Sequence, residues 1–219
     1  MNVLIFAPHR DDELIGMGGT LLKRKSEGAH VTVCIVTAQE GSERSPYTMR
    51  VHEEMKKAHA FCGVDRYIGF PFSANRMETV PRKELNKAFE EALIAVLPEE
   101  VYVPFWGDMQ KDHQITTEAA MVAMRAKYDY APKRIYAYET LSETGISVPT
   151  ANNAFIPNVF VDITDQLDQK LQALSFYQSQ FKPFPDQRSR EAVSALAKFR
   201  GALVNVQAAE AFMLVREIQ

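Results

Sequence analysis

The sequence predicts an α/β protein with a Rossmann-like, doubly wound and mostly parallel sheet that carries helices on both faces. One observation predicts this fold class, and a second predicts the size of the core. Short apolar, β-rich runs alternate with longer stretches in which apolar residues recur every three or four positions. In addition, 219 residues with 46% hydrophobic content can bury a sizeable core. We therefore expect a single domain over residues 1–219.

Up to residue 141 the predicted strands and helices alternate. Five apolar runs are expected strands: Val3–Ala7, Val31–Val36, Tyr67–Phe70, Val101–Phe105 and Ile135–Tyr138. Four stretches between them have helical periodicity: Asp12–Glu27, Tyr47–Phe61, Arg82–Leu97 and His113–Lys127. Strands that alternate with helices pair in parallel, and the ligand site of such a sheet lies beyond the carboxyl ends of the strands.

After residue 141 the pattern changes, and we expect residues 142–219 to form a C-terminal strand/helix extension packed on the core of residues 1–141. A polar segment, 142–153, leads into one more predicted strand, Asn158–Asp162. Helical sequence follows at Asp165–Gln180 and Arg188–Lys198. The last piece, Ala208–Glu217, has helical character and is expected to dock back on the main sheet.

Composition narrows the class of partner and the compartment. A formal net charge of −3 gives no electrostatic reason to expect nucleic acid or an anionic membrane as a partner. The apolar runs are strand-sized, and the first one follows no basic region, so we expect no membrane span, no signal peptide and a cytoplasmic location. The chain has two cysteines, Cys34 and Cys62, which suit buried positions. A metal ion would therefore take nitrogen and oxygen ligands.

The first predicted strand runs directly into five ionisable residues, His9 to Glu13. Acidic residues in the first turn of a helix can cap its free N–H groups, but capping does not explain His9 or the glycines of the GMGG segment that follows. A divalent metal ion explains more, because His9 and one aspartate could bind it while the other aspartate acts as a base. Both interpretations stay open from these residues alone. Phosphate binding by GMGG is disfavoured, since the acidic residues would repel phosphate.

A second polar cluster, Trp106 to His113, follows the predicted strand Val101–Phe105. A lone histidine near a helix start is more often structural than a ligand, and Asp112 alone would make a good N-cap. His113 nevertheless follows a strand, as His9 does, so both histidines should lie at the same edge of the sheet. The two clusters could thus bind one ion. The remaining histidines have no carboxylate at ligand spacing and are expected at the surface or at a pocket rim: His30, His52 and His59.

Several motifs of the sequence resemble those of one enzyme family. PHRDDE, the GMGGTL that follows it and the later DMQKDH resemble the PHPDDE, glycine-rich and HxDH motifs of the LmbE/PIG-L zinc-dependent N-acetylglucosaminyl deacetylases. Similarity extends to the Arg50–Glu53 region leading into CGV, to PNVFVDITDQLDQKLQAL and to AEAF, and so covers nearly the whole chain. The resemblance implies a hydrolase that removes an N-acetyl group from an N-acetylglucosamine-type amino sugar or its conjugate.

The same resemblance implies roles for individual residues. By motif position, His9, Asp12 and His113 bind the metal ion, which is Zn²⁺ or another divalent ion such as Fe²⁺. Asp11 is the general base that takes a proton from the attacking water. Asp112 is expected to orient a histidine through a hydrogen bond to its ring N–H.

Two residues depart from the family motifs. Arg10 replaces the second proline of PHPDDE, which leaves the ligand spacing unchanged and supplies a candidate contact for an anionic group of the substrate. Gln110 replaces the first histidine of HxDH, which in the family stabilises the oxyanion or protonates the leaving amine. Glutamine can donate to an oxyanion but cannot carry a proton. The enzyme is then expected to be slower, to use protonated Asp11 as the acid, or to use another histidine such as His52.

Two other functions compete with the hydrolase. The chain could be a metal-retaining binding or regulatory protein that has lost turnover through Gln110. A nucleotide-binding Rossmann enzyme ranks last, because no GxGxxG turn follows the first strand. For the hydrolase, we expect the segments 39–48, 72–80 and 142–156 to shape the pocket, with Arg50 and Glu139 as further candidate substrate contacts.

Overall fold

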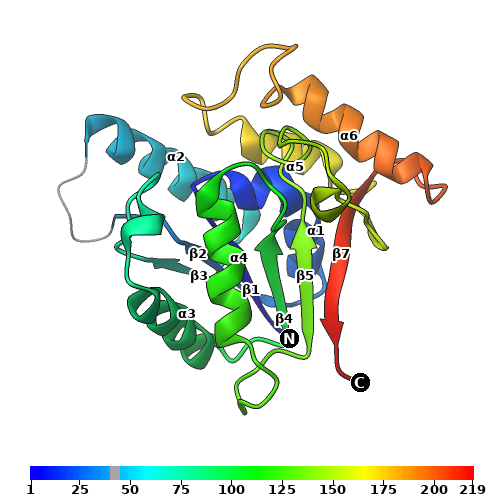
Figure 1. Ribbon diagram of the computed structural model, residues 1–219. Coiled ribbons are helices and arrows are strands. Elements are labelled where there is room, and N and C mark those ends of the chain that lie inside the picture. The colour runs from blue at the N-terminus through cyan, green and yellow to red at the C-terminus, as the bar shows by residue number, and fades with distance from the viewer. Residues whose placement is uncertain (40–44) are drawn as a thin grey trace.

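The computed structural model of the chain describes residues 1–39 and 45–219 (Figure 1). The strands of this part form one sheet in the order β3-β2-β1-β4-β5-β7-β6. Their bounds are β1 (Asn2–Ala7), β2 (His30–Ile35), β3 (Arg66–Gly69), β4 (Glu100–Pro104), β5 (Arg134–Tyr138), β6 (Val159–Asp162) and β7 (Ala209–Glu217). Strands β1 to β5 run parallel, and β7 is antiparallel to both β5 and β6. The prediction of a mostly parallel sheet is confirmed.

Helices cover both faces of the sheet, so the fold is doubly wound (Figure 1). Their bounds are α1 (Asp12–Ser26), α2 (Pro46–Cys62), α3 (Arg82–Val96), α4 (Lys111–Ala123), α5 (Leu167–Leu174) and α6 (Arg190–Ala202). Helices α3 and α4 pack together on one face, while α1, α2 and α5 pack on the other and α6 contacts β6 and β7. Among the described residues, no helix combines the length and the apolarity that crossing a membrane requires.

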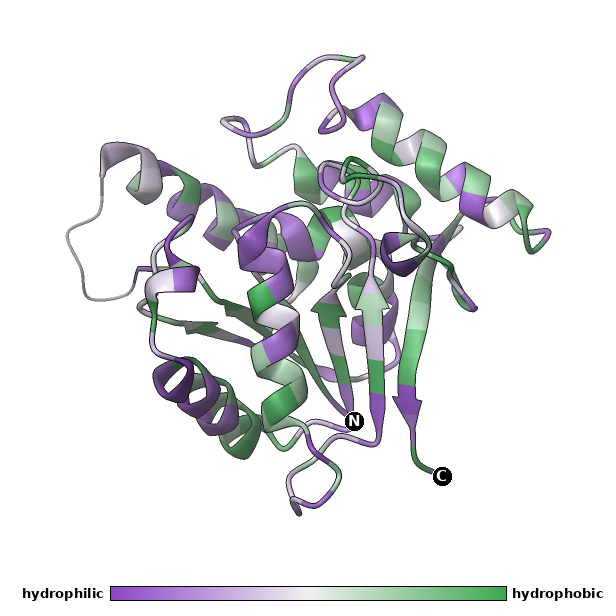
Figure 2. Ribbon diagram, in the orientation of Figure 1, coloured by the Kyte–Doolittle hydropathy of each residue, from purple (hydrophilic) through white to green (hydrophobic). Residues whose placement is uncertain are grey.

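The core consists of two apolar layers, one on each side of the sheet. In β1, Val3, Ile5 and Ala7 face the layer under α1 and α2, while Leu4 and Phe6 face the layer under α3 and α4. All five side chains are fully buried, and Figure 2 shows mainly hydrophobic residues along the strands. Burial of a side chain such as leucine or phenylalanine contributes about 1.5–3 kcal/mol. Because side chains on both faces of β1 are buried, its sequence is a continuous apolar run, as expected for a strand covered on both faces.

Helix α1 is kinked one turn after the ionisable cluster, at Met17 (φ −146°, ψ 25°). The N–H groups beyond the kink are satisfied by the Glu210 carboxylate of β7, which accepts hydrogen bonds from Gly19 N at 2.9 Å and Thr20 N at 2.6 Å. Lys170 of α5 lies 2.6 Å from the same carboxylate, and both side chains are almost fully buried. The C-terminal extension thus caps the second half of α1.

Two glycines of α1 allow the helix to approach the sheet closely. A Cβ at Gly16 would overlap the ring of Tyr138 in β5. A Cβ at Gly19 would lie 2.7 Å from Cδ1 of Ile163, which follows β6. Close packing therefore accounts for these two glycines without a role in phosphate binding.

The predicted helical character of residues 208–217 is wrong, because this segment is strand β7. Its backbone N–H and C=O groups pair with β5 on one side and β6 on the other, and Ala209, Ala211 and Phe212 are buried. Tertiary pairing outweighs the helix preference of alanine, glutamate, methionine and leucine. The helix predicted over Asp165–Gln180 is also shorter in the structure, since α5 covers Leu167–Leu174.

Candidate metal centre and its cavity

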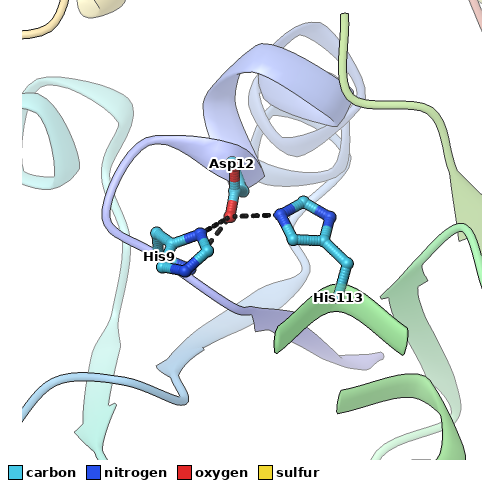
Figure 3. Close-up of side chains that lie close together, drawn as sticks. All are labelled: His9, Asp12 and His113. Carbon is cyan, nitrogen blue, oxygen red and sulfur yellow. Dashed lines mark hydrogen bonds and ion pairs between the residues drawn. The ribbon is translucent and has the colours of Figure 1, made fainter. Parts of the chain in front are cut away.

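The two polar clusters meet at the carboxyl ends of neighbouring strands. His9 and Asp12 follow β1, and His113 lies in the first turn of α4, just after β4. Because β1 and β4 pair in parallel, these strand ends share one edge of the sheet. The structure therefore brings together the three residues proposed from sequence as metal ligands (Figure 3).

One carboxylate oxygen joins the three side chains. Asp12 Oδ2 lies 3.1 Å from His9 Nδ1 and 3.3 Å from His113 Nε2 (Figure 3). One nitrogen or oxygen atom from each residue lies within 4.8 Å of the others. Asp12 Oδ1 and His113 Nε2 are buried without a hydrogen-bond partner among the described residues. Two imidazole nitrogens and a carboxylate are a donor set that a divalent metal such as zinc accepts, so these residues could hold such an ion.

A carboxylate orients His9 from the side opposite Asp12. His9 Nε2 lies 3.0 Å from Asp112 Oδ2, and the same oxygen accepts a hydrogen bond from the backbone of Asn75 at 2.7 Å. Asp112 does not cap its helix, because α4 begins after Gln110 and no side chain caps it. A carboxylate on the outer nitrogen fixes the ring orientation and the tautomer of a histidine ligand. Asp112 thus lies in contact with a histidine ring, and its role in orienting that ring stays a prediction.

Asp108 makes the equivalent contact with His113, and sequence reasoning missed it. His113 Nδ1 lies 2.8 Å from Asp108 Oδ2. The other oxygen, Asp108 Oδ1, accepts a hydrogen bond of 2.5 Å from Thr144 Oγ1. The acidic residue five positions before His113 was a sequence signal for such a contact. Its second partner, Thr144, lies on a distant segment and gave no such signal. Each histidine thus has one nitrogen toward Asp12 and the other held by a carboxylate.

The pKa values of the three side chains reflect these ion pairs. Burial alone would lower the pKa of His9, but hydrogen bonds to Asp112 and Asp12 outweigh it and raise the pKa to about 9. Burial opposes protonation of His113 too, yet Asp12 and Asp108 raise its pKa to about 10. The histidines hold the pKa of Asp12 well below its usual range, although burial would raise it. A metal ion would therefore displace protons from both rings.

Asp11 presents a buried carboxylate beside this cluster. Its backbone has φ 131°, a conformation that L residues rarely adopt, and such strain concentrates at functional sites. Asp11 Oδ2 makes no hydrogen bond among the described residues and lies 3.5 Å from Arg188 Nη1. Burial raises the pKa of Asp11 to about 8, although the guanidinium of Arg188 acts in the opposite direction.

Glu13 supports the Asp11 turn through its buried carboxylate. Its Oε2 accepts a hydrogen bond of 3.2 Å from the backbone N–H of Asp11. Its Oε1 lies 2.8 Å from His59 Nε2 and accepts a hydrogen bond of 3.1 Å from the hydroxyl of Tyr177. The expectation that His59 lies on a solvated flank or pocket rim is wrong, since this buried partner of Glu13 is only 6% exposed.

A cavity of about 280 Å³ opens beside His9 and Asp11. Its polar lining also includes Arg10, Gln110, Glu143, Gln180 and Arg188. The segments 72–80 and 142–156 contribute Ala74 and Glu143. The segment 39–48 contributes residues on both sides of 40–44, which lie outside the described residues. The volume is close to the lower end of the range for small-molecule sites.

The predicted substrate contacts occupy different positions. Arg10 lines the cavity, as does Gln110, whose Nε2 donates to Asn75 Oδ1 at 3.2 Å. Arg50 is exposed on α2 and does not line the cavity. Glu139 is paired with Arg200 through two hydrogen bonds of 2.8 and 2.7 Å and lines a separate cavity. Of the three predicted contacts, the structure places Arg10 alone at the cavity beside Asp11.

Comparison with known proteins identifies the family. Residues 4–124 match the PIG-L family, described as GlcNAc-PI de-N-acetylase, and this match spans His9, Asp12 and His113. It covers more than half of the chain. The protein belongs to the PIG-L family. The resemblance stated from the sequence motifs is therefore confirmed.

A curated relative and several solved structures are similar to this chain over most of its length. The diacetylchitobiose deacetylase of Thermococcus kodakarensis is 27% identical over 82% of this chain and 70% of its own. The N,N'-diacetylchitobiose deacetylase of Pyrococcus horikoshii superposes with a TM-score of 0.78 at 22% identity, over 98% of this chain and 83% of its own. GalB, the 4-carboxy-2-hydroxymuconate hydratase of Pseudomonas putida, gives a TM-score of 0.75 at 18% identity, over 100% of this chain and 97% of its own. Deacetylases and a hydratase thus share the fold, so the fold alone does not fix the reaction.

Proposed function

We propose that the protein is a metal-dependent hydrolase that removes an N-acetyl group from an N-acetylglucosamine-type amino sugar or its conjugate. The observation that carries this proposal is the cluster of half-buried His9 with buried Asp12 and His113, which lies beside the Asp11 carboxylate at the wall of a cavity. Membership of the PIG-L family and similarity to a diacetylchitobiose deacetylase support it.

The proposed metal ligands are His9, Asp12 and His113, and the proposed ion is Zn²⁺ or another divalent metal such as Fe²⁺. The donor set and the unpartnered buried atoms Asp12 Oδ1 and His113 Nε2 fit such an ion. When bound, the ion supplies Lewis-acid polarisation of the amide carbonyl and lowers the pKa of water. Asp108 and Asp112 hold the outer nitrogens of the two histidines and so keep the ligand atoms aimed at one point.

Asp11 is the proposed general base. Its Oδ2 has no hydrogen-bond partner among the described residues and stands at the cavity wall, so it can accept a proton from a water molecule that attacks the acetyl carbonyl carbon. The strained backbone and the Glu13 hydrogen bond fix the direction of this carboxylate. Gln110, on the same cavity, can donate an N–H to the oxyanion that develops on the carbonyl oxygen.

One residue favours a second candidate function, a metal-retaining binding or regulatory protein without turnover. Gln110 cannot transfer a proton, and a site that lost this step would still hold a metal ion and a sugar. Against this candidate stands Asp11, because a site freed from catalysis would have no need of a strained, buried carboxylate. We therefore rank the hydrolase first.

Acetate release from a panel of N-acetylated amino sugars tests the proposal. The zinc-loaded protein should release acetate from at least one member, and Asp11→Asn should lose about 10²-fold or more of this rate because it removes the base. Asp168→Asn, an exposed aspartate of α5, is the matched control and should keep the rate. Zinc-loaded protein that binds a panel member but releases no acetate would favour the binding protein instead.

A further inference from the structure

Hydrolysis of an amide requires a proton on the nitrogen of the leaving amine when the C–N bond breaks. An amine leaves poorly as an anion, so this step needs an acid within reach of the nitrogen. Gln110 occupies the wall of the cavity and has no proton to transfer. His52, an alternative acid considered from the sequence, packs its ring against Tyr67 with centroids 5.8 Å apart and does not line the cavity.

The described lining of the cavity offers few other acids. Three of these residues carry a carboxyl or imidazole group, namely His9, Asp11 and Glu143. His9 is engaged on both ring nitrogens, by Asp12 and by Asp112. Asp11 is already the proposed base. We propose that Glu143 is the general acid that protonates the leaving amine, an inference that rests on the proposed deacetylase function.

Contacts of the backbone place Glu143 beside the metal cluster. Its N–H donates to the carbonyl of Thr140 at 2.8 Å, and the N–H of Thr140 donates to Thr144 Oγ1 at 2.9 Å. The same Thr144 hydroxyl donates to Asp108, the carboxylate that holds His113. The turn over residues 140–144 is therefore tied directly to the site.

The Glu143 carboxyl group is itself available for proton transfer. It is half-buried at the cavity wall, and it makes no hydrogen bond or ion pair within the described part of the chain. This distinguishes it from Glu139 four residues earlier, whose two oxygens are both held by Arg200. A free carboxyl group can turn toward a substrate nitrogen without breaking a contact.

The surroundings of Glu143 favour the protonated form that an acid needs. Burial raises the pKa of Glu143 most, and the nearby carboxylates Asp12 and Asp108 raise it further. Positive charges act in the opposite direction. Charged groups from three segments face Glu143. His9 and Asp12 follow β1, Asp108 and His113 lie between β4 and the first turn of α4, and Arg188 precedes α6.

The proton transfers balance as follows. Asp11 takes a proton from water as the water oxygen bonds to the carbonyl carbon. When the C–N bond breaks, its electron pair stays on the nitrogen, which receives the proton of Glu143. The acetyl group leaves as acetic acid, which ionises to acetate at neutral pH, and Asp11 returns its proton to Glu143 through water. No oxidant, reductant or co-reactant other than water is required.

The test compares two leaving groups in the wild type and in Glu143→Gln. An N-acetyl amino sugar needs an acid for its amine, whereas p-nitrophenyl acetate releases a phenolate that needs none. Glu143→Gln should therefore lose about 10²-fold on the amide and stay within about threefold of the wild type on the ester. The wild-type amide rate should fall as pH rises through the pKa of Glu143, and the variant should lack this basic limb. Glu53→Gln, exposed on α2, is the matched control.

The outcomes separate this inference from the proposed function. An unchanged amide rate in Glu143→Gln, or an equal loss on both substrates with normal zinc content and melting temperature, would overturn the role of Glu143. Should Glu143→Gln fold poorly, Glu143→Asp, which keeps an acid, is compared with the neutral variant Glu143→Ser. The rate of Glu143→Asp should exceed that of Glu143→Ser by a larger factor on the amide than on the ester. Adding Gln110→His to Glu143→Gln should restore the amide rate. A wild type without acetate release from any panel member would instead refute the deacetylase itself.

Discussion

At the residue scale, Asp12 is the centre of the site. Its Oδ2 accepts a hydrogen bond of 2.9 Å from the backbone N–H of His9 and faces one ring nitrogen of each histidine. Asp12, together with Asp112 at His9 and Asp108 at His113, outweighs burial and raises the pKa of His9 to about 9 and that of His113 to about 10 in the metal-free protein. A metal ion must then compete with two protons.

This competition predicts a steep pH dependence of zinc affinity. Both histidines bind metal only when neutral, so affinity should rise by up to about 10²-fold per pH unit between about pH 6 and about pH 8. Calorimetric titration of zinc in buffers of different ionisation enthalpy would measure the affinity and the protons released together. An affinity that levels off just above 6.5, the ordinary pKa of histidine, would contradict the raised pKa values.

At the element scale, the Lys170–Glu210 pair joins three elements: the kinked α1, α5 and β7. The pair is buried, and Glu210 also accepts the two N–H groups freed by the kink. Removing one partner of a buried ion pair leaves an uncompensated charge, which costs about 3–5 kcal/mol. Glu210→Gln should therefore lower the free energy of unfolding by this amount, as measured by urea denaturation.

Two further variants make this stability prediction specific. Glu217→Gln, exposed at the far end of the same strand, should have a negligible effect. Lys170→Met combined with Glu210→Gln should cost less than the sum of the two single changes, because the double variant leaves no unpaired charge. Strictly additive losses would show that the two side chains contribute independently.

Local sequence predicted the elements that carry the three proposed metal ligands. An apolar run that ends abruptly in ionisable residues is a strong signal, and it located both β1 with His9 and β4 with His113. Strand β7 was not predictable in this way, because its residues favour a helix and only pairing with β5 and β6 makes it a strand. The elements of the parallel core were thus readable, and those set by long-range pairing were not.

The same distinction applies to the side chains of the site. The three proposed ligands lie in motifs with informative spacing. By contrast, Arg188 reaches Asp11 from a distant segment, and Glu143 reaches the cavity through a turn tied to Asp108. No local pattern marks such residues, since their positions depend on how the C-terminal extension folds onto the core.

At the scale of the whole molecule, we propose that residues 1–219 fold as one domain. Strands β6 and β7 complete the sheet that β1 to β5 begin, and β7 covers the edge of β5. The extension also supplies Glu210 to cap α1 and Tyr177 to hold Glu13. The elements that carry the proposed metal ligands are therefore held in place by residues beyond 141.

A fragment of residues 1–141 should consequently not fold on its own. It would lack the β7 partner of β5, and it would expose the apolar residues that α5 and β7 cover. Thermal unfolding followed by circular dichroism should give one cooperative transition for the full chain and none for the fragment. A sharp transition of the isolated fragment would contradict the single-domain proposal.

Anomalous diffraction at the zinc absorption edge, recorded from zinc-loaded crystals, would locate the metal ion. One peak should lie about 2.0–2.2 Å from a nitrogen of His9, an oxygen of Asp12 and a nitrogen of His113. The peak should be lost in Asp12→Ala, with Asp168→Ala as the control. Zinc bound elsewhere, or no peak at this cluster in well-ordered crystals, would contradict the claim that these three residues form a metal centre.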